Sequence, residues 1–269
     1  MINSTALFEL NEQGIGTITL NRPQLHNAFD EKMIETLSNQ LETIAQSPDI
    51  RLVVIKANGK SFSAGADLNW MQKMTQYTKE ENQQDANALA ILLNQLYTLP
   101  QPTIALVHGN AFGGGVGLVA CCDIVIASET AEFCFSEVKL GLIPAVISPY
   151  VIKAIGARQA KRYFISAEQF SASEAKILGL VDEVLPHYGL EPALNHLLQD
   201  LLQYGPQAMR AIKRLVLDIQ DYPIDETLME VTSHCIAAIR VSEEGQQGLK
   251  AFLTKRKPDW TATFTKEPQ

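Results

Sequence analysis

The clearest folding pattern in the sequence is residues 103–127, which read TIALVHGNAFGGGVGLVACCDIVIA. A continuous apolar run over 103–107 is typical of a strand buried on both faces, and a second run covers 123–127. Between them, a triple glycine opens a segment through residue 122 that we expect to be a helix. The succession of strand, helix and strand predicts a βαβ crossover and therefore an α/β fold with a parallel sheet.

The same alternation extends toward the N-terminus. Two apolar runs, 8–10 and 15–20, flank the turn-forming residues Asn-Glu-Gln-Gly and predict a β-hairpin. Apolar residues recur at helical spacing over 30–46 and again around 88–96, and each pattern is followed by a proline. The short apolar run 52–55 predicts another buried strand.

The C-terminal part of the sequence is different in character. A short strand is expected at 132–135, and beyond residue 148 the pattern is almost entirely helical apart from 181–185. The expected helices there cover about 190–203, 205–220, 224–240 and 242–253. The change near residue 190 predicts a core over 1–190 and a helical region over 191–269.

Composition excludes several classes of protein. The 269 residues include 22 Lys and Arg against 30 Asp and Glu, a net charge of −8, which disfavours nucleic acid as the main partner. The four cysteines form no CxxC pair, as expected of reduced thiols in a cytoplasmic protein. The longest uncharged stretch, 86–122, is interrupted by proline, glycine and polar residues, so we expect a buried core and no membrane partner. No metal-binding motif is recognised, and we expect no metal.

Two junctions between a strand and a helix stand out as a possible site. One junction, residues 63–68, follows the strand 52–55, and the other, residues 108–115, follows the strand 103–107. Small residues let a ligand approach the backbone, and helix N-termini present unpaired N–H groups. One amide from each junction, converging on one carbonyl oxygen, would make an oxyanion hole. Each glycine cluster alone is equally typical of a tight turn or of close helix packing.

Glu137 is the candidate acid. It lies in the segment 133–144, FCFSEVKLGLIP, and a carboxylate among Phe and Leu side chains is partly desolvated. Desolvation raises the pKa toward the range that is useful for proton transfer. The alternative is an exposed loop glutamate paired with Lys139.

Together these segments resemble the crotonase (enoyl-CoA hydratase/isomerase) superfamily along nearly the whole chain. The resemblance rests on residues 21–23 with 27–28, 62–68, 109–117 with 122–124, and 136–144. It implies a repeated ββα spiral core, a C-terminal helical trimerisation region, and a homotrimer or a dimer of trimers. It also implies an acyl-CoA substrate, carried as a coenzyme A thioester with no other cofactor. Within the superfamily, residues 133–150 look most like bacterial methylglutaconyl-CoA hydratase-like members.

The resemblance also assigns roles to individual residues. It implies that the amides of Ala66 and Gly114 bind the thioester oxygen while Glu137 transfers protons. The residues that it places against coenzyme A are Ala64, Asp67 and Leu68, through their backbone, and Phe252 and Lys255, on a neighbouring subunit. Two alternatives remain: Asp67 as an ordinary helix cap, and Lys255 as part of an exposed basic tail.

One position departs from the pattern of the hydratases. Typical members carry two glutamates, and the first is replaced here by Gly117, whereas the second is retained as Glu137. Hydration of a 2-enoyl-CoA needs a group that activates water and a proton source for Cα. A Δ3,Δ2-enoyl-CoA isomerase needs only one base.

Three functions are therefore open. We expect an enoyl-CoA hydratase acting on a branched or carboxylated substrate such as methylglutaconyl-CoA. A Δ3,Δ2-enoyl-CoA isomerase and a non-catalytic acyl-CoA-binding subunit are the alternatives. A distal substrate carboxylate would need a cation, for which Lys73, Lys139 and Lys153 are equal candidates.

Overall fold

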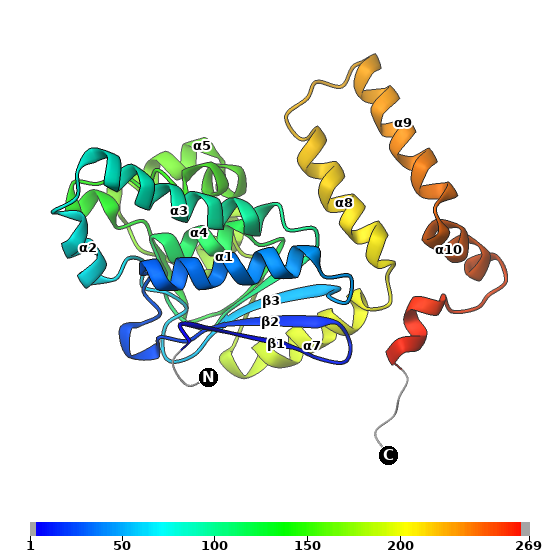
Figure 1. Cartoon of the computed structure of the whole chain (residues 1–269), viewed down its shortest axis with the longest axis horizontal. Coiled ribbons are helices and arrows are strands. Elements are labelled where there is room, and N and C mark those ends of the chain that lie inside the picture. The colour runs from blue at the N-terminus through cyan, green and yellow to red at the C-terminus, as the bar shows by residue number, and fades with distance from the viewer. Residues whose placement is uncertain (1–3, 265–269) are drawn as a thin grey trace. The chain divides into compact units, whose positions relative to one another are not determined.

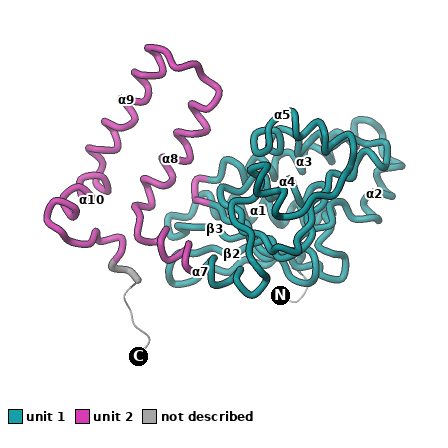
Figure 2. The backbone as a smooth tube through the Cα atoms, turned by 180° about the vertical axis from the view of Figure 1, so that it is seen from behind, with its two compact units in different colours: residues 1–99, 103–194 teal, residues 100–102, 195–269 magenta. Residues whose placement is uncertain are grey.

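The computed structural model describes residues 4–264 and divides them into two compact units, coloured separately in Figure 2. The first unit runs to residue 99 and continues over 103–194, and the second comprises 100–102 and the chain from 195 onward. The boundary expected from sequence, between residues 190 and 191, lies at the start of helix α7 (Leu190–Leu201). The outer ends of the two expected ranges, residues 1–3 and 265–269, lie outside the described residues.

A six-stranded sheet forms the centre of the first unit, in the order β1-β2-β3-β4-β6-β9. The first two strands form the expected antiparallel hairpin, and every other neighbouring pair is parallel. The strands are β1 (Ala6–Leu10), β2 (Ile15–Leu20), β3 (Leu52–Ala57), β4 (Thr103–Val107), β6 (Ile124–Ser128) and β9 (Glu183–Leu185). All five residues of β4 are buried, as the continuous apolar run predicted.

A second, three-stranded sheet lies beside the strand ends. It has the order β5-β7-β8, with β5 (Ala111–Phe112), β7 (Glu132–Cys134) and β8 (Phe170–Ser171). The chain passes from β4 through β5 into α4 (Gly114–Cys121), and from β6 through β7 toward α5 (Ser148–Ser166). Each turn therefore supplies a strand to each sheet and then a helix. This is the repeated ββα arrangement that the resemblance implied.

Helices cover the large sheet, and Figure 1 shows α1 (Glu31–Gln46), α3 (Lys79–Tyr97) and α4 gathered on one side of β1, β2 and β3. Helix α1 begins where the sequence predicted, because the Asp30 carboxylate accepts a hydrogen bond from the Met33 amide. The remaining helices of the first unit are α2 (Leu68–Met74) and α6 (Ala172–Leu178).

Three details differ from the sequence-based expectation. Helix α3 begins at Lys79, well before the apolar residues that indicated it, because Thr78 and Glu81 form a capping box ahead of a polar first half. Strand β5 was not predicted, since two residues are too few to show alternation. The predicted strand 132–135 exists as β7, but it belongs to the second sheet.

The second unit is helical, as expected. Its helices α8 (Pro206–Ile219), α9 (Glu226–Val241) and α10 (Glu243–Leu253) begin and end within two residues of the predicted ranges. The Glu244 carboxylate accepts hydrogen bonds from the Gln207 and Ala208 amides, which joins α10 to the N-terminus of α8. None of the helices described has the length and hydropathy needed to cross a membrane.

Candidate active site

The two glycine junctions and Glu137 meet at one cavity of about 550 Å³ in the first unit. Its walls include Ala66 from the first junction, Gly114 from the second, and Glu137 from the short helix that follows β7. Helices α2 and α3 form the opposite wall. Residues that the sequence placed in three separate segments therefore face one space.

Close backbone contact explains why the junctions are rich in glycine. Ser63 and Ala111 form a parallel bridge that draws the two segments together. Gly65 has a φ of +86°, and a Cβ there would lie 3.0 Å from the Phe112 carbonyl oxygen. Gly113 has a φ of +48°, and a Cβ there would lie 3.1 Å from Oε1 of Glu137. Side chains at these two positions would separate the junctions or displace the carboxylate.

Two backbone amides face away from the protein's own acceptors. Phe29 donates its N–H to the Gly65 carbonyl at 2.6 Å and accepts from the Asp67 amide at 2.8 Å. Because this parallel bridge uses the residues on either side of Ala66, the Ala66 N–H points to the opposite side. Gly114 is the first residue of α4, so its N–H has no acceptor within the helix. Within residues 4–264, neither amide has an acceptor.

Glu137 presents one carboxylate oxygen without a partner. It opens the 3₁₀ helix Glu137–Leu140, and its Oε2 atom is fully buried without a hydrogen bond to any described residue. Burial raises the pKa of Glu137. The described residues include no ion pair between this side chain and Lys139, whose own side chain is exposed. A half-buried carboxylate with one unpaired oxygen at a cavity wall is suited to accept a proton.

The place of the missing second acid is filled by an apolar side chain. A Cβ at Gly117 would lie 2.4 Å from Cγ2 of Ile147, which is buried and lines the cavity. The replacement of glutamate at this position is therefore accompanied by packing that leaves it no room. The acids that line the cavity in the part of the chain that the structure describes are Glu137 and Asp85.

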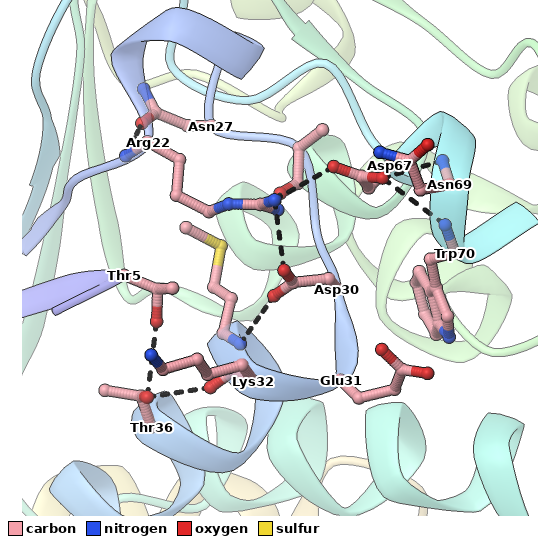
Figure 3. Close-up of polar contacts among 12 residues, drawn as sticks. Thr5, Arg22, Asn27, Asp30, Glu31, Lys32, Thr36, Asp67, Asn69 and Trp70 are labelled. Carbon is pink, nitrogen blue, oxygen red and sulfur yellow. Dashed lines mark hydrogen bonds and ion pairs between the residues drawn. The ribbon is translucent and has the colours of Figure 1, made fainter. Parts of the chain in front are cut away.

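An ion pair behind the first junction fixes the start of α2. The Arg22 guanidinium lies between Asp30, at 3.0 Å, and Asp67, at 2.9 Å (Figure 3). Asp67 also caps α2 by accepting hydrogen bonds from the amides of Asn69 and Trp70. Burial alone would raise the pKa of Asp67, but these two amides and the guanidinium lower it below its ordinary value.

The residues expected to contact coenzyme A lie in both units. Ala64 and Leu68 line the cavity, but the buried Asp67 does not, and its side chain acts as the helix cap that was the alternative. Phe252 and Lys255 lie in the second unit, where both side chains are exposed. Their predicted contact with the coenzyme A of a neighbouring subunit stays a prediction.

The candidate cations for a distal carboxylate do not line the cavity. Lys73 is bound to Glu31, with 3.0 Å between Nζ and Oε1, and neither Lys139 nor Lys153 contributes to the walls. The sequence analysis missed a different polar group, Asp85, which lines the cavity from α3. The sequence could have indicated this residue by helical spacing: three- and four-residue steps place four residues on one face of α3, Asn82, Asp85, Ala86 and Leu89. The described residues contain no group of three or more His, Cys, Asp or Glu side chains placed to hold a metal.

Comparison with known proteins gives consistent matches over almost the entire chain. The model of the family described as enoyl-CoA hydratase/isomerase matches residues 10–263. The crystal structure of an enoyl-CoA hydratase from Shewanella pealeana ATCC 700345 is 48% identical, has a TM-score of 0.92, and covers 95% of this chain and 96% of its own.

Curated relatives carry more specific names. The 2,3-dehydroadipyl-CoA hydratase of Escherichia coli strain K12 is 32% identical over 252 residues, which are 93% of this chain and 96% of that protein. Enoyl-CoA isomerase/hydratase fer4 of Mycosarcoma maydis is 32% identical over 258 residues, which are 92% of this chain and 93% of that protein. The relatives thus include names for both types of reaction.

Proposed function

The chain belongs to the enoyl-CoA hydratase/isomerase family, and from this membership we propose that it adds water across the double bond of a 2-enoyl-CoA thioester. One observation carries the proposal. Glu137, with one unpaired carboxylate oxygen, and the unpaired amides of Ala66 and Gly114 line one cavity, where a thioester and a water molecule can meet.

The proposed reaction uses these groups in turn. The thioester oxygen accepts hydrogen bonds from the Ala66 and Gly114 amides, which stabilise the enolate that forms when water attacks C3. The ionised Glu137 takes the proton from that water and returns a proton to C2, so the carboxylate is regenerated and no atom is lost. One oxyanion donor of this kind is typically worth about 2.7–4 kcal/mol.

The contacts with coenzyme A and the oligomeric state are proposed from the family resemblance. We propose that the backbone of Ala64, Asp67 and Leu68 lines the coenzyme A site, and that Phe252 and Lys255 reach the coenzyme A of a neighbouring subunit in a homotrimer or a dimer of trimers. Lys255 supplies a cation to an anionic ligand on a chain of net charge −8. Methylglutaconyl-CoA, suggested by residues 133–150, and the dehydroadipyl-CoA named for the bacterial relative are the carboxylated substrates to compare with crotonyl-CoA.

Hydration is tested by adding crotonyl-CoA and following the loss of absorbance from its conjugated thioester. The wild-type protein is expected to turn the substrate over, and the Glu137→Gln variant is expected to lose at least about a hundredfold in kcat/KM. Turnover by the wild type that does not exceed the Glu137→Gln level would reject the proposal.

A second candidate, Δ3,Δ2-enoyl-CoA isomerisation, is favoured by Ile147 in the place of the first glutamate of typical hydratases, which leaves Glu137 without that second acid. It needs one base that moves a proton from C2 to C4. A 3-enoyl-CoA would then gain conjugation without uptake of oxygen from solvent, which is the opposite optical change. Calorimetric binding of acyl-CoA without turnover of either substrate would instead identify a non-catalytic acyl-CoA-binding subunit.

A further inference from the structure

Asp85 places a negative charge in the part of the cavity that lies toward α2 and α3. The residue sits on α3, and its Oδ1 accepts a hydrogen bond from Nε1 of Trp70 at 2.9 Å. Trp70 is a buried residue of α2 and lines the same cavity. The carboxylate is therefore held in one orientation by a rigid side chain, and it is partly screened from solvent.

The surroundings of Asp85 are otherwise apolar. The walls contributed by α2 and α3 are formed by Met71, Met74, Ala86 and Leu89, with one further polar side chain, Asn82. These side chains suit a hydrocarbon chain. Asp85 is half-buried beside these apolar walls, so its charge is screened less than in bulk water.

No positive charge compensates Asp85 from within the cavity. Among the described residues that line it, the ionisable side chains are Glu137 and Asp85, both acids, and there is no Lys, Arg or His. The lysine of α2, Lys73, is held outside by Glu31, at 3.0 and 3.2 Å from its two carboxylate oxygens. An acyl chain ending in a carboxylate would meet a like charge with no cation on the cavity walls.

We propose that Asp85 makes the acyl cavity selective for uncharged enoyl groups and excludes those that end in a carboxylate. This inference rests on the proposed function, since it takes the cavity as the site of the acyl chain. It gives Asp85 the role of a specificity-determining residue and leaves proton transfer to Glu137. It also makes two carboxylated thioesters poor substrates of this enzyme: methylglutaconyl-CoA, which the resemblance suggested, and the dehydroadipyl-CoA named for the bacterial relative.

Binding of two saturated thioesters tests the inference without any chemical step. Hexanoyl-CoA and adipoyl-CoA have six-carbon chains and differ in the terminal carboxylate. Because burial raises the pKa of Asp85, calorimetry is done at a pH well above that raised pKa and gives the ratio of the two Kd values. Wild-type protein is expected to favour hexanoyl-CoA by about tenfold or more, as expected for like charges within several ångströms. Asp85→Asn, which keeps an acceptor for Trp70, is expected to remove most of that preference.

Glu80→Gln is the matched control, because it removes one negative charge from an exposed position on the same helix outside the cavity. It is expected to keep the wild-type ratio and to hydrate crotonyl-CoA within about twofold of the wild-type rate. Equal binding of the two thioesters by wild type, an unchanged ratio in Asp85→Asn, or binding of neither thioester would overturn the inference. Failure of wild-type hydration with the binding preference intact would overturn only the proposed reaction.

Discussion

At Gly117, the lack of a side chain is a packing requirement as well as a chemical departure. Any Cβ there would meet Ile147, since both residues are buried against each other. The sequence revealed that an acid is missing at this position. It could not reveal what fills the space, because the partner lies thirty positions away and its contact depends on how α4 and α5 pack.

We expect Gly117→Ala to lower the free energy of unfolding by about 1–3 kcal/mol through overpacking. The cost should be smaller when Ile147→Ala is introduced with it, because the truncated side chain makes room. Urea unfolding of the two single variants and the double variant measures the coupling. Strictly additive costs would show that the two residues do not compete for the same space.

The raised pKa of Glu137 predicts that, as the pH rises, activity increases and the contribution of this residue to stability decreases. Burial raises this pKa, so the acidic limb of kcat/KM is expected above the ordinary glutamate value of about 4.3 and should be absent from Glu137→Gln. The folded state holds the proton more tightly than the unfolded state. The contribution to stability is therefore present below the ordinary pKa and is lost as the pH rises through the raised value.

This direction is tested by measuring the free energy of unfolding of wild type and Glu137→Gln at pH values from below the ordinary glutamate pKa to above the raised one. Wild-type protein should lose stability relative to Glu137→Gln as the pH rises, because the glutamine stays neutral. A stability difference that moves the other way with pH, or an acidic limb at or below the ordinary value, would contradict the burial of this carboxylate.

At the level of elements, the segments that position the site were predictable to different degrees. Apolar periodicity located α1 and the buried strand β4, because long patterns average over many residues. Strand β5 could not be predicted, since a two-residue strand forms only when β7 lies beside it. The wall formed by α3 was missed for a related reason: which face of a helix lines a cavity depends on the neighbouring helix.

Asp67 caps α2 and pairs with Arg22, which follows β2, so replacing it should lower the free energy of unfolding more than a surface substitution does. We expect Asp67→Ala to lower the free energy of unfolding by about 2–4 kcal/mol, because it removes the cap of α2 and a buried partner of Arg22. Asp67→Asn keeps an oxygen for the cap and should cost less. Thermal unfolding of both variants tests this, and equal costs would show that the cap contributes nothing.

This carboxylate also contributes to the acid stability of the protein. Because the folded state lowers the pKa of Asp67, its contribution is present above the ordinary aspartate pKa and is lost as the pH falls through the lowered value. The difference in stability between wild type and Asp67→Asn should therefore shrink on acidification.

At the level of the whole molecule, the second unit carries many large apolar side chains that are exposed. They lie on each of its three long helices and include Ile212, Val216, Met229, Ile236, Phe252 and Leu253. The sequence predicted these helices from their amphipathic spacing. It could not identify what covers them, because a helix periodicity does not distinguish a face buried within the chain from one buried against another copy.

We expect those faces to be covered by other copies of the chain, so the protein should sediment as a trimer or as a dimer of trimers. Ile212→Glu places a charge on such a face and should shift the mass toward smaller species, because an unpaired charge is costly to bury. Analytical ultracentrifugation measures the mass of the wild-type protein and of the Ile212→Glu variant. A monomeric wild-type protein at micromolar concentration would contradict the trimer.

The most direct test of the site is a crystal structure with a bound, unreactive saturated thioester such as butyryl-CoA. The account predicts that the thioester oxygen lies about 2.7–3.1 Å from the amide nitrogens of both Ala66 and Gly114, with the Glu137 carboxylate beside the carbons next to the carbonyl. A thioester bound elsewhere, or one whose oxygen touches neither amide, would contradict it.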